Sequence, residues 1–147
     1  MSVPSQQPKI SDHVRQRTRE WFRKAEHELA YLAVAPFDSE DPPTDTTCKM
    51  AHMVAEYVLK AYLMLNKRKI HKSHDLLEIL NECVAIHDDQ DFEQLRPDCQ
   101  VLTQYRVTLV YPLALPTYVS VREAKEAIEK AKRIMAFVLH KSKALGY

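Results

Sequence analysis

Four fixed positive charges and two histidines gather within eight consecutive residues of this sequence. They are Lys67, Arg68, Lys69, His71, Lys72 and His74. Side chains of these types bind phosphate groups, and a helix that begins just after them would point free backbone N–H groups at the same ligand. The spacing therefore predicts an anion-binding site at this turn. Its candidate ligand-binding residues are Arg68, His71, Lys72 and His74, together with Lys60 from the preceding helix.

Two other interpretations apply to the same turn. Cations at the end of a helix oppose the negative end of its dipole, and a turn is hydrophilic in any case. His71 and His74, which are followed by Asp75, are also spaced so that they can share a metal ion, but the sequence shows no third or fourth ligand. A histidine just before a helix is more commonly a capping or packing residue. We therefore expect neither a metal nor a cofactor.

A second group of aromatic and basic side chains lies around the prolines near residue 112. Tyr105, Arg106, Tyr111 and Tyr118 belong to it. An aromatic ring beside an arginine can grip a base by stacking without a glycine-rich loop. Tyr105, Arg106 and Tyr111 are therefore further candidate ligand-binding residues. The alternative is that this group closes the end of the fold or meets a second protomer.

The helix that must deliver the basic turn runs from Cys48 to about Asn66. Its apolar residues recur at steps of three and four along two neighbouring stripes, which is typical of a helix buried on most of its circumference. The polar residues form one narrow line through Lys49, His52, Glu56 and Lys60. Side chains on this line lie where polarity is costly unless it is paired.

The remaining sequence predicts further helices and no strand. The first starts after Ser11 or Asp12 as its N-cap and runs to about Ala33. The others run from His74 or Asp75 to His87, from about Phe92 to before Pro112, and from about Val119 to Leu145. Pro97 should start a new helix or kink an existing one, and Asp75 and Glu78 are spaced like a capping box. We expect an all-α, up-and-down bundle of four or five helices. Residues 1–11 form a flexible tail, and residues 12–147 form one domain.

Composition excludes several classes of site. The chain has 147 residues and one glycine, Gly146, so it contains no glycine-rich phosphate loop and no dinucleotide fingerprint. The net charge of +1 gives no strong overall field for nucleic acid or membrane. Three widely spaced cysteines favour buried thiols in a reducing compartment. With no apolar run long enough for a membrane span, we expect a cytoplasmic protein.

The order of several short motifs resembles the HEPN domain family. They are Trp21 with Ala25 and Leu29, Cys48-x-x-Ala51, Ala55-Glu56-x-x-Leu59-Lys60-Ala61, Ser73-His74-Asp75-Leu76, Tyr105, Tyr111-Pro112, and Ala127 with Ile128 and Ala131. The resemblance covers about residues 12 to 139. It implies a bundle of about five helices, homodimerisation through helix faces, and a role in nucleotide or RNA binding or beside a small nucleotidyltransferase.

Many members of this family are metal-independent ribonucleases that carry an arginine and, after four to six intervening residues, a histidine near the end of the fourth helix. The matching segment here, from Arg106 to Pro112, contains no histidine. Tyr111-Pro112 resembles the branch without nuclease activity, although the arginine that precedes this pair in that branch is Val110 here. Two other pairs have the ribonuclease spacing but lie in a turn and on the last helix, namely Arg68 with His74 and Arg133 with His140.

Three hypotheses about function follow. The leading one is a non-catalytic helical homodimer that binds a nucleotide or nucleotide-like anion, or acts as the partner of a minimal nucleotidyltransferase. The first alternative is a metal-independent ribonuclease toxin. The second is a purely structural dimerisation module. We predict no catalytic residues under the leading hypothesis, because the ribonuclease motif is absent from its expected position.

Overall fold

The computed structural model describes residues 9–70, 72–109 and 118–147. The helices in these ranges are α1 (Asp12–Leu32), α2 (Thr44–Leu65), α3 (Leu76–His87), a short 3-10 helix η1 (Gln90–Leu95), α4 (Arg96–Leu109) and α5 (Val121–Ala144). The described ranges contain no strand, which confirms the predicted all-α bundle. Residues 1–8 of the predicted N-terminal tail lie outside the described residues.

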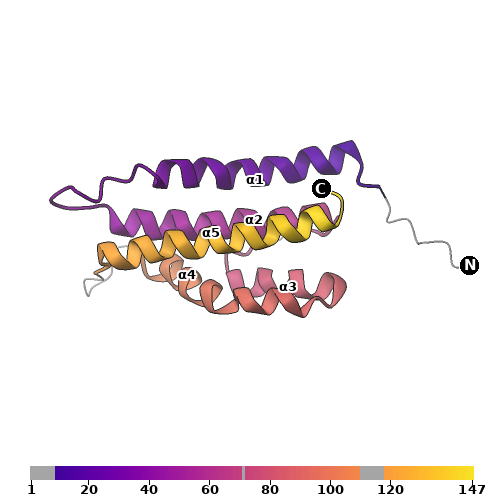
Figure 1. Cartoon of the computed structure of the whole chain (residues 1–147). Helices are drawn as coiled ribbons and strands as arrows, with labels where there is room; N and C mark the ends of the chain where they lie inside the picture. Colours follow the sequence, from indigo (N-terminus) through magenta and orange to yellow (C-terminus); the bar gives the residue numbers. More distant parts are fainter. Residues whose placement is uncertain (1–8, 71, 110–117) are drawn as a thin grey trace, which may run out of the picture.

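Helix α2 is the central element of the bundle. It packs against α1, α3, α4 and α5, and most of its side chains are buried. In Figure 1, α1 lies on one side of α2 and α5, and α3 and α4 lie on the opposite side. The two apolar stripes of the sequence are therefore explained, because α2 is covered on most of its circumference.

The connection between α2 and α3 turns back along α2. His52 contacts residue His74, Leu59 contacts Cys83, and Asn66 contacts His87, so α3 runs in the same direction as α2. Simple alternation of helix direction is interrupted at this step. Residues 66–75 are enough to lead the chain from the end of α2 back to the level of His52. A segment of that length reaches about 30 Å when extended, whereas the 14 residues of helix between His52 and Asn66 span only about 21 Å.

Helix starts follow the predicted caps with small differences. Ser11 accepts a hydrogen bond from the Val14 N–H at 3.2 Å, and Asp75 accepts one from the Leu77 N–H at 3.0 Å. Helix α2 starts at Thr44, directly after Pro43 and four residues before Cys48, because the first turn of a helix needs no N–H from that proline. Pro97 lies in the first turn of α4, so a new helix does begin there.

Candidate functional site

A buried carboxylate lies at the centre of the polar line on α2. The Oε2 atom of Glu56 accepts a hydrogen bond from the Lys60 ammonium at 3.2 Å, and its Oε1 atom lies 2.9 Å from Nδ1 of His74. The side chains of Glu56 and Lys60 are 4% and 6% exposed, whereas that of His74 is 47% exposed. Because a carboxylate can only accept here, His74 carries a proton on Nδ1, and its Nε2 atom is left for other partners.

His52 holds the backbone of the same residue. Its Nε2 atom lies 2.9 Å from the carbonyl oxygen of His74, so Nε2 carries the proton and donates it. Burial lowers the pKa of the His52 imidazole, and the positive charge of Arg106 lowers it further. A neutral His52 therefore fixes the main chain of His74 while Glu56 fixes its ring.

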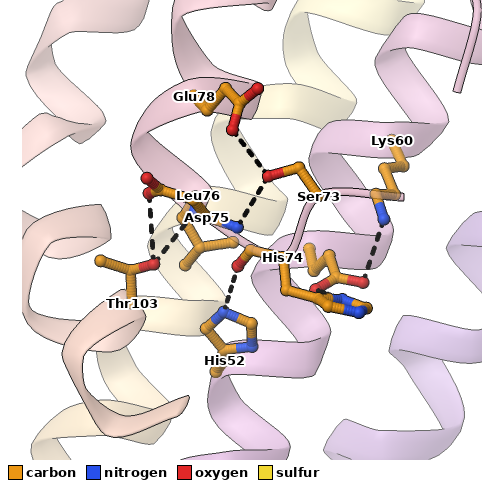
Figure 2. Close-up of polar contacts among 9 residues, drawn as sticks. His52, Lys60, Ser73, His74, Asp75, Leu76, Glu78 and Thr103 are labelled. Carbon is orange, nitrogen blue, oxygen red and sulfur yellow. Dashed lines mark hydrogen bonds and ion pairs between the residues drawn. The ribbon is translucent and has the colours of Figure 1, made fainter. Parts of the chain in front are cut away.

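Hydrogen bonds also join the residues around His74 to α3 and α4 (Figure 2). The Ser73 hydroxyl donates to Glu78 at 2.8 Å and accepts from the Asp75 N–H at 3.2 Å. Glu78 therefore reaches Ser73, and not the Asp75 N–H that a capping box would use. The Leu76 N–H donates to the Thr103 hydroxyl on α4 at 3.1 Å. The last residues before α3 are thus anchored by three helices.

The exposed cations lie earlier in the same connection. Arg68, Lys69 and Lys72 are exposed, and His71 lies outside the described residues. Arg68 and Lys69 line a cavity of about 290 Å³ beside α3. The other described residues of its lining are Leu63, Glu82, Ala85 and Ile86. The cavity therefore combines an apolar wall with two cations and one carboxylate.

Lys60, predicted from the sequence as an anion ligand, is buried against Glu56. Its charge is already balanced there, and its position suits an anchor for the connection. Glu56 and His52 were not among the predicted site residues, although both lie on the polar line that the sequence revealed. The signal that could have found them is the placement of charge and imidazole on an otherwise buried helix.

The second predicted group is only partly described. Tyr105 and Arg106 are half-buried on α4, whereas Tyr111 lies outside the described residues. The pKa of the Tyr105 phenol is raised to about 12, chiefly by burial, with a contribution from its hydrogen bond to Cys48. Tyr105 therefore faces the core thiol of Cys48, and Arg106 lies near enough to His52 for its charge to act there. Tyr118 is 84% exposed, at the edge of the described part.

Three cysteines are buried and free, and their burial raises the pKa of each thiol. Within residues 9–70, 72–109 and 118–147, no three His, Cys, Asp or Glu side chains are arranged to hold a metal ion. None of the helices described has the length and apolar character needed to span a membrane.

One known family has a sequence model that matches most of the chain. The model of a family described as HEPN domain matches residues 18–142, a range that begins within α1, ends in the last turn of α5 and includes Glu56, Lys60 and His74. Searches of the curated proteins and of the solved structures gave no match.

Proposed function

The chain belongs to the HEPN domain family, and from that premise we propose that it is a non-catalytic binding module for a nucleotide or nucleotide-like anion. The ligand would lie at the connection between α2 and α3. The observation that carries the proposal is the anchoring of this connection by Glu56 and His52, because both side chains are buried and both hold His74. Because His74 is held in this way, it loses little conformational freedom when an anion binds beside it.

The cavity beside Arg68 offers both surfaces that a nucleotide needs. Leu63, Ala85 and Ile86 form an apolar wall on which a base can pack, and Arg68 and Lys69 supply positive charge for phosphate. A volume of about 290 Å³ is close to the lower end of the range for small-molecule sites, about 300–1,000 Å³. The cavity thus suits a mononucleotide better than a dinucleotide.

The absence of a histidine supports a non-catalytic role. In ribonucleases of this family, the histidine would lie near the end of the fourth helix. The segment from Arg106 to Pro112 has no histidine, and a proton acceptor is needed to activate a ribose hydroxyl. Arg106 and Tyr105 remain candidates for stacking on a base, as proposed from the sequence. Tyr111 and His71 complete the proposed set of ligand-binding residues, with Lys72 and His74, whereas Lys60 supports this set through its ion pair with Glu56.

The nucleotide-binding proposal is tested by titrating AMP and ATP into the protein by calorimetry, with thermal shift as a second readout. We expect saturable binding, and we expect Arg68→Gln combined with Lys69→Gln to weaken it by about tenfold or more, the effect of losing charge-assisted hydrogen bonds. The matched control is Arg19→Gln with Arg23→Gln, because both arginines are exposed on α1. Absence of binding by the unmodified protein, or equal loss in both double variants, would contradict the proposal.

The ribonuclease alternative has one observation in its favour. The Glu56 carboxylate orients the His74 imidazole at 2.9 Å, which is how a general base is held in many hydrolytic sites, and Arg68 precedes His74 with the ribonuclease spacing. Incubation with RNA in the presence of a chelator decides between the two. Cleavage that is lost in Arg68→Gln and in His74→Gln would replace the binding module with an enzyme.

The assembly of the molecule is proposed from the family resemblance. A homodimer, a complex with a minimal nucleotidyltransferase, or both would use apolar surface, and Tyr31 and Val34 at the end of α1 are 75% and 78% exposed. Light scattering after gel filtration tests for the homodimer. Co-purification with a nucleotidyltransferase encoded beside this chain tests for the complex. A stable dimer that ignores every nucleotide would favour the purely structural module.

A further inference from the structure

A second cavity lies at the opposite end of α2 from its first turn, where the ends of several elements meet. Its volume is about 290 Å³. Four aliphatic side chains form the walls: Ile10 just before α1, Val14 in its first turn, Leu65 at the end of α2 and Leu145 just after α5. Such a wall favours an apolar ligand surface by about 25 cal/mol for each Å² removed from water.

The polar lining of this cavity is cationic or neutral. Lys9, Asn66, Lys67 and His87 supply it, and none of the described residues that line the cavity is a carboxylate. Neither the Lys9 nor the Lys67 ammonium has an ion-pair partner among the described residues. Two other hollows of the surface differ in this respect. The lining of the cavity beside Arg68 includes Glu82, and a groove between α1 and α5, which runs along Leu29 and Lys125, is lined in part by Glu126 and Glu129. Charge therefore selects an anion here.

Lys67 reaches this cavity from a strained backbone position. Its φ angle is +57°, and it lies where α2 ends in a Schellman motif, with the Arg68 N–H bonded to the Leu63 carbonyl at 2.9 Å and the Lys67 N–H to the Met64 carbonyl at 3.0 Å. Glycine is the residue with the lowest cost at this position. A lysine is present instead, and backbone strain of this kind is concentrated at binding and catalytic sites.

We propose that this cavity binds a small organic carboxylate with an aliphatic body. The aliphatic part would lie against Ile10, Val14, Leu65 and Leu145, and the carboxylate would accept hydrogen bonds from the Lys67 and Lys9 ammonium groups. His87 is oriented for its place in the lining, because its Nε2 atom donates to Asn66 Oδ1 at 3.0 Å. The site is separate from the proposed nucleotide cavity and does not depend on it.

The test uses octanoate as the probe and the full chain as the protein. Calorimetric titration should give saturable binding of octanoate, with binding of 1-octanol and octylamine weaker by about tenfold or more, since each loses the charge-assisted hydrogen bonds. Amide chemical shifts of Lys67 and Leu145 should move with the same saturation. No binding of octanoate, or equal binding of 1-octanol, would overturn the proposal.

Two glycine variants separate ligand binding from backbone strain. Lys67→Gly removes the ammonium and relieves the strained φ angle, so we expect octanoate affinity to fall about tenfold while the unfolding midpoint rises by about 2–4 °C. Among the residues that the structure describes, Asp88, at the end of α3, is the other non-glycine residue with positive φ, at +49°. Asp88→Gly should not lower the midpoint and should leave octanoate affinity unchanged or slightly stronger, because it removes a negative charge.

The octanoate affinities of the same two variants would also reveal that the cavity is not a carboxylate site. Octanoate affinity that is unchanged in Lys67→Gly would show that the lysine does not bind the carboxylate. Affinity that falls equally in Asp88→Gly would show that the effect comes from the helix ends and not from the ammonium. Either result would overturn the proposal, and because Lys67→Gly is expected to be more stable, unfolding would not explain a loss of binding.

Discussion

Glu56 is the residue on which the ordering of the cationic connection depends. Its carboxylate is buried between the Lys60 ammonium and the His74 ring. Glu56→Gln would leave the Lys60 ammonium without a counter-charge inside the bundle. Breaking a buried pair on one side costs about 3–5 kcal/mol, and we expect a loss near the lower value, about 3 kcal/mol, because His74 stays half-exposed. Urea unfolding measures the loss.

Two variants control this prediction. Glu26→Gln changes an exposed glutamate of α1 and should alter the free energy of unfolding by less than about 0.5 kcal/mol. Adding Lys60→Met to Glu56→Gln removes both charges and should recover part of the loss, since apolar replacement of a buried pair is often neutral or stabilising. No recovery in the double variant would show that Lys60 does not depend on Glu56.

The sequence predicted the location of these residues better than their role. The line through His52, Glu56 and Lys60 is visible because apolar residues surround it. Its purpose is not visible, because that depends on the return of the chain from Asn66 to His74, which no local pattern encodes. Lys60 therefore looked like a ligand for an external anion, although the anion it binds is Glu56.

His52 gives the fold a dependence on pH. Burial lowers the pKa of its imidazole below the ordinary value of 6.5. The unfolded chain therefore binds a proton near pH 6.5 that the folded chain takes up only at lower pH. The stability from neutral His52 should be complete above about pH 6.5 and should decrease as the pH falls from there towards the pKa in the folded state.

His52→Gln isolates this dependence, because glutamine retains a donor for the His74 carbonyl and does not titrate. The difference in free energy of unfolding between the two proteins, measured by urea unfolding from pH 5 to pH 8, should narrow as the pH falls. A difference that is constant across this range would show that His52 does not carry the expected pH dependence.

At the scale of elements, the start of α3 is tied to α4 by one hydroxyl. Thr103 accepts a hydrogen bond from the Leu76 N–H at 3.1 Å, and Leu76 is buried. Thr103→Val keeps the shape but leaves that N–H without its partner, so we expect a loss of about 1–3 kcal/mol. Thr108→Val is the matched control, because the Thr108 hydroxyl on the same helix donates to the Gln104 carbonyl one turn earlier and to no other element among the described residues. Similar losses in both would contradict this role of Thr103.

Element boundaries could be predicted where a local cap exists and not where packing decides. Ser11 and Asp75 cap α1 and α3 as expected, because a short polar side chain before a helix acts over three residues. On α5, the acid-first spacing of Glu126 with Lys130 and of Glu129 with Arg133 favours two ion pairs along the helix, but Glu126 and Arg133 have other partners. Glu126 binds Arg122, and Arg133 binds Asp98 on α4. A distant carboxylate decided the second of these.

At the scale of the whole molecule, the bundle could be predicted but its path could not. Amphipathic spacing and the absence of interior glycine indicate packed helices. The direction of α3 relative to α2 depends on where the connection is anchored, and His52 and Glu56 set that point. One core cluster joins all the helices, from Phe22 and Ala25 on α1 to Ala131 and Val138 on α5.

This single core predicts that the three cysteines become reactive together. Cys48, Cys83 and Cys99 lie on α2, α3 and α4, are fully buried, and have thiol pKa values raised by burial, to about 12 for Cys48 and Cys99. A thiol reacts as its thiolate, so each should react only when the structure opens. The three thiols can be modified with a disulfide reagent at increasing urea concentrations, and mass spectrometry of peptides then gives the rate for each cysteine. If α3 and α4 unfold together with α2 as one unit, all three cysteines should be modified at one common rate. Faster labelling of Cys83 and Cys99 than of Cys48 would instead show that α3 and α4 detach from α2 as a separate unit, and the connection that holds His74 would then open with them.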